Sequence, residues 1–525
     1  MRKIIIGSRG SELALWQANY IKGLLEALDV EVEIKIIKTQ GDVFFNLNIQ
    51  KLEGKGFFTK ELEEELLKGS IDLAVHSFKD LPTQGPAGLT IGAVPARENP
   101  ADLLLIRPDS LDIKKTFSLV QNAIVGTSSP RRKSQMLAHR SDLQMTDLRG
   151  NVPTRLQKLR DGDFDAILVA KAGINRLNLD LSDFHVENVS ATEIIPAPAQ
   201  GALALQIRVN DKQLEEKLAF INDPDAVIVT SIERDILSLF GGGCQSPMGI
   251  YCRKEKNLFQ VWTCKSESFE EFPDRLFMTS EKSEGLAERV VAQFNGVKDR
   301  VSSVFISREL NQGGYLQTYL EKKGVSLEGR SLIRTFPIIH KLDSSILSRV
   351  DWVFFNSKNA VEYFFALKPK TNTAVKFGVV GRGSEAALRH LGLEASFVGE
   401  ASDTSMVARK FAKLTIGKTV LFPQAKDSLR SIQNGLSAET IAIDLPIYET
   451  EADENSFYSD AQVLIFTSPS NVSSYIERNL IELNQKVIAI GKSTGSKLEE
   501  YNVSNFLIPY SPDELGLAEA VFSLM

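Results

Sequence analysis

The chain has 525 residues, of which 43% are hydrophobic and 24% charged, and its 61 basic and 67 acidic residues leave a net charge of -6. This length predicts about three to four domains, and the composition is typical of a globular protein. The acidic balance excludes general binding of nucleic acid through a basic face. No apolar run is long enough to cross a bilayer, and the start lacks the apolar core of a secretory signal. We therefore expect a cytoplasmic protein without nucleic-acid or membrane partners.

The first half alternates short apolar strands with amphipathic helices, which predicts an α/β fold with a mostly parallel sheet. Strands are predicted over residues 4–6, 32–37, 71–75 and 166–170, and helices over about 11–28 and 59–68. Two proline-bearing stretches, 94–100 and 194–201, are interpreted as crossovers between two lobes. A cleft between such lobes is the expected place for a ligand. Residues 43–58 show little periodicity and are interpreted as a mobile loop that could serve as a lid; an ordinary surface excursion is the alternative.

Cys244 stands directly behind three glycines, where a helix is predicted to end. Glycines remove bulk and let the backbone turn, so the thiol can face a cleft rather than pack in a core. The other cysteines are Cys252 and Cys264, and spacings of 8 and 12 fit no common zinc motif. We expect a reduced protein without a metal. A thiol that can be alkylated, in a chain with clustered arginines, indicates a covalently anchored ligand that carries several carboxylates.

The arginine clusters begin at Ser129, a predicted helix N-cap that is followed by Pro130 at the first helical position. Such a helix start offers free amides and a positive dipole end to an anion. Arg131 and Arg132 in the first turn are unfavourable there unless an anion is present, so the motif predicts an anion site; a solvent-exposed helix start is the alternative. Guanidinium groups grip carboxylates in pairs, and further arginines near predicted strand ends and turns are Arg9, Arg149, Arg155 and Arg176.

Asp80 lies in the motif His76-Ser77-Phe78-Lys79-Asp80-Leu81-Pro82, directly after the predicted strand 71–75. A carboxylate that points into a cleft from this position can stabilise a cation and move protons. The alternative is an aspartate that only forms the turn before Pro82.

The second half contains an internal repeat. Residues 354–361 are echoed by 465–472, and residues 380–384 by 490–494, at offsets of 24 and 23 within the copies. Each copy is predicted to be a strand that ends in a hydroxyl-rich turn and starts a helix. Residues 336–339 and 445–448 are interpreted as paired linkers between two lobes, and a boundary near 297–301 separates the halves.

The motifs of residues 3–290 resemble those of porphobilinogen deaminases, also called hydroxymethylbilane synthases. They are Ile6-Gly7-Ser8-Arg9, Gly54-Lys55-Gly56, 75–82, Gly126-Thr127-Ser128-Ser129-Pro130-Arg131-Arg132, Leu148-Arg149-Gly150-Asn151, Gln200-Gly201-Ala202-Leu203 and Gly242-Gly243-Cys244-Gln245. The second half is similar to uroporphyrinogen-III synthases in its two-lobed repeat, its hydroxyl turns and the motif Ile447-Tyr448-Glu449-Thr450. The chain therefore resembles a fusion of two consecutive enzymes of tetrapyrrole biosynthesis.

The resemblance implies the domain organisation. We expect a two-lobed, periplasmic-binding-protein-like α/β body, then a small α+β domain, then a two-lobed α/β unit of the synthase kind. The expected boundaries are 1–216 for the body (lobe 1, 1–99 and 200–216; lobe 2, 100–199), 217–297 for the cofactor-cysteine domain, and 301–525 for the synthase-like unit (outer lobe, 301–336 and 449–525; inner lobe, 337–448).

For the first half, the resemblance implies a transferase that joins four porphobilinogen units into hydroxymethylbilane and releases ammonia. It implies a dipyrromethane cofactor attached through a thioether to Cys244, and catalysis by Asp80. The residues that match cofactor-binding positions are Lys79, Asp80, Ser128, Ser129, Arg131, Arg132, Arg149, Asn151 and Gly173. Those that match substrate-binding positions are Arg9, Ser11, Arg149, Arg155 and Arg176. The departures from the family pattern are Lys171, Ala199 and Gln206.

For the second half, the resemblance implies a lyase that closes hydroxymethylbilane, a linear tetrapyrrole, to uroporphyrinogen III. Tyr448 matches a tyrosine that assists the departing water. Helix starts would hold the carboxylates through the hydroxyls of Ser357, Ser384, Ser468 and Thr494, although each hydroxyl could serve only as a helix cap. Ser384 departs from a position where threonine is common.

Two other interpretations remain at this point. A two-lobed body with an arginine-lined cleft can be a non-catalytic receptor for anions, but that class gives no reason for Cys244 behind its glycines. The chain could also be an active deaminase whose C-terminal half is not catalytic.

Overall fold

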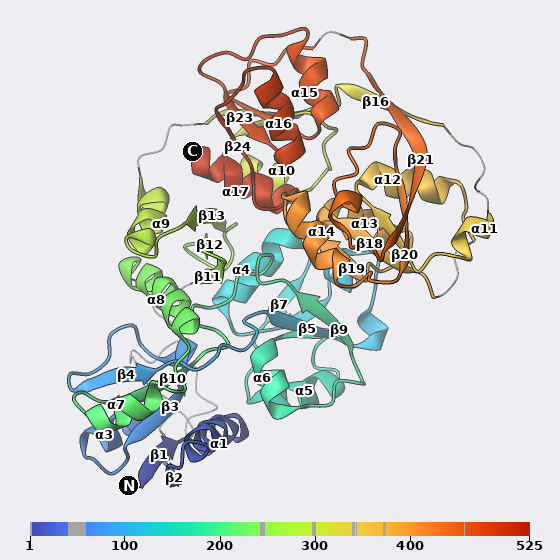
Figure 1. Cartoon of the computed structure of the whole chain (residues 1–525). Coiled ribbons are helices and arrows are strands. Elements are labelled where there is room, and N and C mark those ends of the chain that lie inside the picture. Colours follow the sequence, from blue (N-terminus) through green and yellow to red (C-terminus); the bar gives the residue numbers. More distant parts are fainter. Residues whose placement is uncertain are drawn as a thin grey trace. The chain divides into compact units, whose positions relative to one another are not determined.

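The computed structural model describes residues 3–39, 59–241, 247–296, 301–338, 342, 344–370, 374–455 and 457–525 (Figure 1). The chain divides into two compact units. Unit 1 comprises Met1–Leu111 and Leu119–Gly296, and unit 2 comprises Asp112–Ser118 and Val297–Met525. Among the helices of the described residues, none has the length and apolar character that crossing a membrane requires.

The first sheet of unit 1 has the strand order β2-β1-β3-β10-β4. Its strands are β1 (Ile4–Ser8), β2 (Val32–Ile36), β3 (Leu73–Ser77), β4 (Leu89–Ala93) and β10 (Leu203–Arg208), accompanied by helices α1 (Glu12–Glu26), α3 (Lys60–Leu67) and α7 (Lys212–Leu218). Ala18, Ile21 and Leu25 recur at helical spacing along α1 and are fully buried. They pack into one apolar core with Ile6 and Leu205 of the sheet, as the predicted amphipathic pattern requires.

The second sheet of unit 1 has the strand order β7-β6-β8-β5-β9. Its strands are β5 (Asp102–Ile106), β6 (Ile124–Gly126), β7 (Gln144–Thr146), β8 (Ala166–Ala170) and β9 (His185–Val189), and its helices are α4 (Pro130–His139), α5 (Val152–Arg160) and α6 (Lys171–Leu177). Strands β5 and β8 are almost continuously apolar, and Leu105 and Ile167 are fully buried in the core of this lobe. The chain passes from the first sheet to the second between β4 and β5 and returns between β9 and β10, so both predicted crossovers are confirmed.

The prediction of a mostly parallel sheet is confirmed for strand direction in unit 1, because four of the five described strands in each sheet run the same way and one opposes them. Within the described strands, each five-stranded sheet has two parallel and two antiparallel pairings. The strands that oppose their neighbours are β5 and β10, the first strands after the two crossovers. A parallel pair needs a connection that returns along the sheet, whereas a strand that arrives from the other lobe can enter its sheet in the opposite direction.

A third part of unit 1 follows β10. It contains α8 (Pro224–Leu239), the antiparallel strands β11 (Met248–Glu255), β12 (Leu258–Lys265) and β13 (Asp274–Ser280), and α9 (Leu286–Asn295). Cys252 and Cys264 form no disulfide and are buried in this sheet. Cys244 belongs to the segment between α8 and β11 and lies outside the described residues, as does the predicted loop at 43–58.

Asp102, the first residue of β5, is a buried carboxylate that binds the start of α4. Its Oδ1 accepts a hydrogen bond from Nη2 of Arg132 at 2.7 Å, and its Oδ2 accepts from Nη2 of Arg131 at 3.1 Å. Nε2 of Gln200, in the second crossover, also donates to Oδ1 of Asp102 at 2.8 Å. Burial alone raises the pKa of this carboxyl, but Arg132 and Arg131 outweigh it and hold the pKa well below its usual range.

Glu233 of α8 is a second buried carboxylate, and it joins both crossovers to the third part of unit 1. Arg97 of the first crossover binds it with two hydrogen bonds of 2.8 and 3.0 Å. The backbone N–H groups of Ala199 and Cys252 donate to it at 2.6 and 2.7 Å. A fully buried carboxylate with four donors is well compensated, so Glu233 fixes α8 against the crossovers.

Unit 2 contains two α/β lobes. The outer sheet has the order β15-β14-β22-β23-β24, and the inner sheet has the order β16-β21-β20-β17-β18-β19. The outer lobe contains β14 (Ser303–Ile306), α10 (Tyr315–Lys322), β15 (Ser326–Gly329), β22 (Val463–Phe466), α15 (Pro469–Ile476), β23 (Lys486–Ala489), α16 (Lys492–Glu500), β24 (Phe506–Leu507) and α17 (Glu514–Leu524). The inner lobe contains α11 (Ser344–Leu347), β17 (Trp352–Phe355), α12 (Lys358–Ala366), β18 (Lys376–Val380), α13 (Gly381–His390), β19 (Phe397–Gly399), α14 (Thr404–Ala412) and β20 (Thr419–Ala425).

The predicted repeat is confirmed. Ser357 follows β17 and caps α12 through the N–H of Ala360, and Ser468 follows β22 and caps α15 through the N–H of Asn471. Their backbone angles are also nearly the same, with φ of -157° and -162°. The second echo also holds, because β18 leads into α13 and β23 leads into α16. One strand–turn–helix design therefore occurs in both lobes.

The linkers between the lobes form a two-stranded ribbon. Strand β16 (Ile333–Pro337) pairs antiparallel with β21 (Ile441–Ala452), with Phe336 opposite Glu449 and Pro337 opposite Tyr448. The lobe boundaries expected at 336/337 and 448/449 fall inside these strands. Residues 333–336 pair with residues 449–452, whereas the pairing of β21 with β20 in the inner sheet ends at Tyr448.

The Asp102→Asn substitution tests the role of the buried carboxylate. The amide keeps the shape but leaves two buried guanidinium groups without a counter-charge, and we expect unit 1 to lose about 3–5 kcal/mol of stability. Urea unfolding followed by tryptophan fluorescence measures this, since Trp16 and Trp262 lie in unit 1. Asp109→Asn removes the exposed partner of Arg107 and should cost less than about 0.5 kcal/mol. Equal losses in the two variants would contradict this role for Asp102.

Candidate active site

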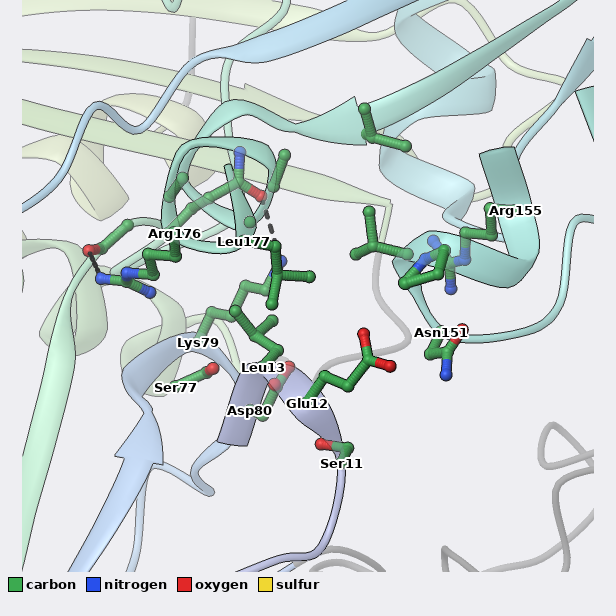
Figure 2. A pocket seen from close by; sticks show the side chains of 18 of the residues that line it. Ser11, Glu12, Leu13, Ser77, Lys79, Asp80, Asn151, Arg155, Arg176 and Leu177 are labelled. Carbon is green, nitrogen blue, oxygen red and sulfur yellow. Dashed lines mark hydrogen bonds between the residues drawn. The ribbon is translucent and has the colours of Figure 1, made fainter. Parts of the chain in front are cut away.

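A cavity with a volume of about 300 Å³ lies between the two sheets of unit 1. The end of β1 and the start of α1 contribute Arg9, Ser11 and Glu12, and the turn after β3 contributes Lys79 and Asp80. Helices α4, α5 and α6 of the second lobe and the second crossover complete the lining. Figure 2 shows Asn151 and Arg155 across the cavity from Arg176, with Lys79 between them. The cavity therefore occupies the place that the two-lobed interpretation predicts for a ligand.

The cavity brings together most of the residues that the sequence singles out for unit 1. The predicted residues that line it are Arg9, Ser11, Lys79, Asp80, Arg132, Asn151, Arg155, Gly173 and Arg176. The predicted residues of the described chain that do not line it are Ser128, Ser129, Arg131 and Arg149. Glu12 and Gln200 also line the cavity, and no feature of the sequence identified either of them as a functional residue.

The lining carries more positive than negative charge. Among the described residues that line the cavity, five side chains are cationic and two are carboxylates, Glu12 and Asp80. Burial lowers the pKa of Arg155 to about 10, and the neighbouring charges of Arg132 and Arg149 act in the same direction. Like charges held close together in a partly enclosed space repel one another, and an anionic ligand relieves that repulsion. The cavity is therefore suited to a ligand with several carboxylates.

Asp80 is presented by a short, firmly anchored turn. Strand β3 ends at Ser77 and is followed by the 3₁₀ turn Phe78–Asp80. Arg234 of α8 lies over the ring of Phe78 at 4.5 Å and donates to the backbone oxygens of Leu81 and Pro82 at 2.9 and 2.6 Å. The backbone on both sides of Asp80 is thus held, while its carboxylate is exposed to the cavity (Figure 2).

Lys79, next to Asp80, places an ammonium group at the inner wall of the cavity. Its Nζ donates to Oε1 of Gln200 at 3.4 Å, the same glutamine that binds Asp102. Burial lowers the pKa of Lys79, and the carboxylate of Asp80 partly opposes the change. Ammonium and carboxylate therefore stand side by side in the cavity, where one can hold an anion and the other can stabilise a positive charge.

The anion that the start of α4 requires is supplied by the protein. Ser129 caps α4 through the N–H of Arg132, and Pro130 occupies the first turn, as predicted. Both arginines of that turn bind Asp102, and Arg131 also donates to the backbone oxygen of Ile195 at 2.8 Å. Both arginines therefore stabilise the second lobe through Asp102, but only Arg132 also lines the cavity. Asp102 is the first residue of an apolar strand, and nothing in the neighbouring sequence indicates that it binds Arg131 and Arg132.

The start of α5 is shaped by the loop before it. Asn151 caps the helix by accepting from the N–H of Thr154 at 2.9 Å. Gly150 has a φ of 121°, and a Cβ there would lie 2.8 Å from Thr154, so this position needs glycine. The turn lets Nε of Arg155 donate to the oxygen of Gly150 at 2.8 Å while the side chain lines the cavity. Arg149 instead lies 3.6 Å from Asp147 and does not line the cavity.

Arg176 of α6 closes the other end of the cavity. Its Nη2 donates to the backbone oxygen of Gly201 at 2.7 Å (Figure 2), and its guanidinium lies 5.8 Å from the ring of Trp16. Burial lowers its pKa. Ser128 donates to the backbone oxygen of Leu148 at 2.9 Å and has a structural contact there.

In unit 2, two predicted residues meet directly. The hydroxyls of Ser357 and Tyr448 are 3.1 Å apart, and the ring of Tyr448 is stacked on that of Tyr363 at 5.1 Å. Burial raises the pKa of Tyr448, although the bond to Ser357 opposes the change. The phenol therefore stays protonated near neutral pH and can donate a proton or a hydrogen bond.

The other predicted hydroxyls of unit 2 are not grouped with this pair. Ser468 caps α15 and also accepts from Nδ2 of Asn471 at 2.9 Å. Ser384 and Thr494 lie in the first turns of α13 and α16, and both are buried. Ser357 and Ser468 each use the side-chain hydroxyl to cap a helix, which is a structural role. A ligand would therefore be bound mainly by the backbone N–H groups at these helix starts.

The described residues contain no group of three or more His, Cys, Asp or Glu side chains that could hold a metal ion. His76 of β3 is a buried histidine with a lowered pKa, and its Nε2 lies 3.0 Å from Oε1 of Gln206. Burial lowers the pKa of His76 to about 4. This ring is a neutral, hydrogen-bonded core residue rather than a ligand.

Comparisons with known proteins agree with the two halves. Residues 4–216 match the family model described as porphobilinogen deaminase, dipyromethane cofactor binding domain, and residues 314–519 match that of uroporphyrinogen-III synthase HemD. A porphobilinogen deaminase of Campylobacter fetus is 47% identical over 258 residues, which are 49% of this chain and 82% of the relative. A porphobilinogen deaminase of Maridesulfovibrio salexigens is 42% identical over 314 residues, which are 58% of this chain and 99% of the relative.

Among solved structures, a uroporphyrinogen-III synthetase of Helicobacter pylori aligns with 42% of this chain and 99% of its own, at 17% identity and a TM-score of 0.30. Similarity that low adds nothing to the family models, on which the assignment of unit 2 rests. The chain belongs to the porphobilinogen deaminase family and carries a uroporphyrinogen-III synthase domain behind the deaminase domain, so that the domains for two consecutive steps of haem biosynthesis are fused.

Proposed function

We propose that the cavity of unit 1 binds a dipyrromethane cofactor, attached through a thioether to Cys244, together with the pyrrole chain that grows on it. The observation that carries this proposal is the convergence of Lys79, Arg132, Arg155 and Arg176 on one cavity beside Asp80. Dipyrromethane bears carboxylates on both rings, which suits this cationic lining. The cavity volume of about 300 Å³ is at the lower end of ligand sites and suits the two rings of the cofactor before the chain is extended.

Cys244 is proposed as the attachment point because the other two thiols are unsuited to it. Cys252 and Cys264 are buried inside the three-stranded sheet, and burial raises the pKa of Cys252 far above the usual range. A protonated thiol without access cannot act as a nucleophile. Cys244 follows α8, the helix whose Arg234 anchors the turn of Asp80. The same two thiols, which form no disulfide, support a reducing, cytoplasmic location.

When bound, the cofactor supplies the nucleophilic pyrrole carbon on which the chain is extended. Asp80 is proposed to accept hydrogen bonds from pyrrole N–H groups and to stabilise the positive charge that develops as porphobilinogen loses ammonia. Lys79 and Arg132 are proposed to hold cofactor carboxylates, with Asn151 and the backbone near Gly173. Arg9, Ser11, Arg155 and Arg176 are proposed to hold those of the incoming substrate. Ser128, Ser129, Arg131 and Arg149 lie outside the lining of the cavity, and their role in holding cofactor carboxylates stays a prediction from the resemblance.

In unit 2 we propose that the two lobes bind hydroxymethylbilane and bring its ends together, which is mainly a problem of orientation. Tyr448 is proposed to donate a proton to the departing hydroxyl group, so that water leaves, while Ser357 fixes the direction of the phenol. The helix starts at Ser357, Ser384, Ser468 and Thr494 are proposed to lie near substrate carboxylates. The competing possibility, a C-terminal half without catalysis, predicts a different product isomer.

The Cys244→Ser variant tests the anchoring thiol. We expect its intact mass to equal that of the polypeptide and its deaminase activity to be lost, whereas the unchanged chain should be heavier by two substituted pyrroles. Cys252→Ala is the matched control, because it removes a buried thiol and should leave the added mass in place. An unmodified chain that still polymerises porphobilinogen would refute the cofactor assignment.

The Asp80→Asn variant tests the carboxylate of the cavity. The fold should be kept, because the side chain is exposed, while the rate of porphobilinogen consumption should fall at least about 100-fold. Glu12→Gln removes the other carboxylate of the lining and should change the rate much less. Similar rates in both variants would mean that only the net charge of the cavity matters, and Asp80 would lose its assigned role.

The isomer of the cyclic product tests the synthase. The unchanged chain, supplied with porphobilinogen, should give uroporphyrinogen III, whereas spontaneous closure gives type I. Tyr448→Phe should lower the rate of closure about tenfold, which corresponds to about 1.4 kcal/mol, and should raise the share of type I. Tyr363→Phe keeps the stacked ring and serves as the control. A predominantly type I product from the unchanged chain would instead favour a non-catalytic C-terminal half.

A further inference from the structure

The repeat of unit 2 places two cations at equivalent positions, and each binds a carboxylate of the other lobe. Arg382 lies in the first turn of α13 in the inner lobe, and its Nη1 is 2.7 Å from Oδ2 of Asp513 in the outer lobe. Lys492 begins α16 in the outer lobe, and its Nζ is 2.7 Å from Oδ2 of Asp403 in the inner lobe. The two ion pairs are therefore reciprocal.

The two aspartates are also equivalent in the repeat, because each is the N-cap of the third helix of its copy. Asp403 caps α14 through Oδ1, which accepts from the N–H of Ser405 at 3.0 Å. Asp513 caps α17 through Oδ1, which accepts from the N–H of Gly516 at 3.0 Å. In both residues one oxygen serves its own helix, and the other oxygen reaches across to the opposite lobe.

The pairs differ in burial and hence in strength. The side chains of Arg382 and Asp513 are 17% and 5% exposed, whereas those of Lys492 and Asp403 are 63% and 22% exposed. Burial raises the pKa of Asp513, but the charge of Arg382 together with the hydrogen bonds from Gly516 and Ser511 lowers the pKa overall. An exposed pair contributes little and is screened by salt, so the contact depends mainly on Arg382 and Asp513.

A backbone hydrogen bond between the lobes lies beside these pairs. The N–H of Ser402, next to Asp403, donates to the oxygen of Tyr510 at 2.7 Å. The covalent connection between the lobes is the β16–β21 ribbon and the chain that continues from it. A hinge of two strands allows the lobes to separate, provided that the ion pairs and this hydrogen bond open.

We propose that Arg382, Asp513, Lys492 and Asp403 form an interlobe clasp that positions the two lobes for closure of the linear tetrapyrrole. They are positioning residues, and the inference rests on the proposed synthase function of unit 2. A long, flexible substrate must enter while the lobes are apart, and its ends must be held together while they are in contact. Ion pairs at the rim of two lobes are contacts that can open and reform without disrupting either core.

The test uses the full chain and the Asp513→Asn variant. Asparagine is as good a helix cap as aspartate, so α17 keeps its cap while the ion pair to Arg382 is lost. Hydrogen exchange of the peptide that contains Ser402 reports on the contact, because that N–H is bonded across the lobes. We expect it to exchange about fivefold faster, as for a contact weakened by about 1 kcal/mol. The share of type I uroporphyrinogen should rise and kcat of closure should fall.

Asp351→Asn is the matched control. Asp351 also accepts a backbone N–H, from Thr419 at 2.9 Å, and also lies near a lysine, with Lys418 at 3.5 Å, but both partners belong to its own lobe. It should leave the exchange at Ser402 and the isomer ratio unchanged. Lys492→Gln should act in the same direction as Asp513→Asn but more weakly, since that pair is more exposed.

The exchange rate at Ser402 tests the clasp, and the product isomer tests its role in ring closure. Exchange at Ser402 that is unchanged in Asp513→Asn would overturn the clasp, and faster exchange with an unchanged isomer ratio and kcat would overturn its positioning role. If Asp513→Asn melts unit 2, Arg382→Gln breaks the same pair without touching the cap and decides in its place. If the unchanged chain makes no type III product, the proposed synthase function fails, while the exchange measurement still decides whether the clasp exists.

Discussion

The cavity of unit 1 depends on one electrostatic constraint, which is that a guanidinium group removed from water needs a carboxylate removed with it. Asp102 satisfies this need for Arg131 and Arg132 together. Arg155 and Arg176 have a different environment, because the hydrogen bonds that hold them go to backbone oxygens, which carry no net charge. The arginines are thus of two kinds. Arg131 and Arg132 fix the start of α4 in the second lobe through Asp102, and Arg132 also reaches the lining of the cavity. Arg155 and Arg176 are held by backbone oxygens and keep a charge that a carboxylate ligand can neutralise.

The same constraint connects the cavity to the segment of the anchoring thiol. Arg97 binds Glu233 of α8 and donates through Nε to the backbone oxygen of Gln200, whose side chain in turn binds Asp102. Buried polar groups that are all satisfied behave as one rigid network. The network spans both crossovers, the start of α4 and the helix that leads to Cys244. The proposed tether and the cationic lining are therefore positioned by a shared set of hydrogen bonds. We expect a change in one crossover to shift both the segment of Cys244 and the lining of the cavity.

The features that the sequence predicted are those with local signals. Hydrophobic spacing identified α1 and the strands, and the caps Ser129, Ser357 and Ser468 followed from a hydroxyl placed directly before a helical pattern. The features that it missed join distant residues: Asp102 and Arg132 are 30 positions apart, and Arg97 and Glu233 are 136 apart. The direction of β5 and β10 was missed for the same reason, since it depends on where the chain returns from the other lobe. Nor does the sequence separate Arg131 from Arg132, because adjacent residues of a helix point about 100° apart and only the fold decides which one faces the cavity.

Unit 2 shows how a repeat turns a local feature into a contact between lobes. A capping aspartate has a spare oxygen, and in a single copy that oxygen would face solvent. When two copies of the design face each other, the spare oxygen of each meets the cation of the other, so one ion pair implies a second. The copies have nevertheless diverged in burial, which makes the pairs unequal. Separation of the lobes therefore costs little at the exposed Lys492 pair and much more at Arg382, where a largely buried charged pair must be exposed to water.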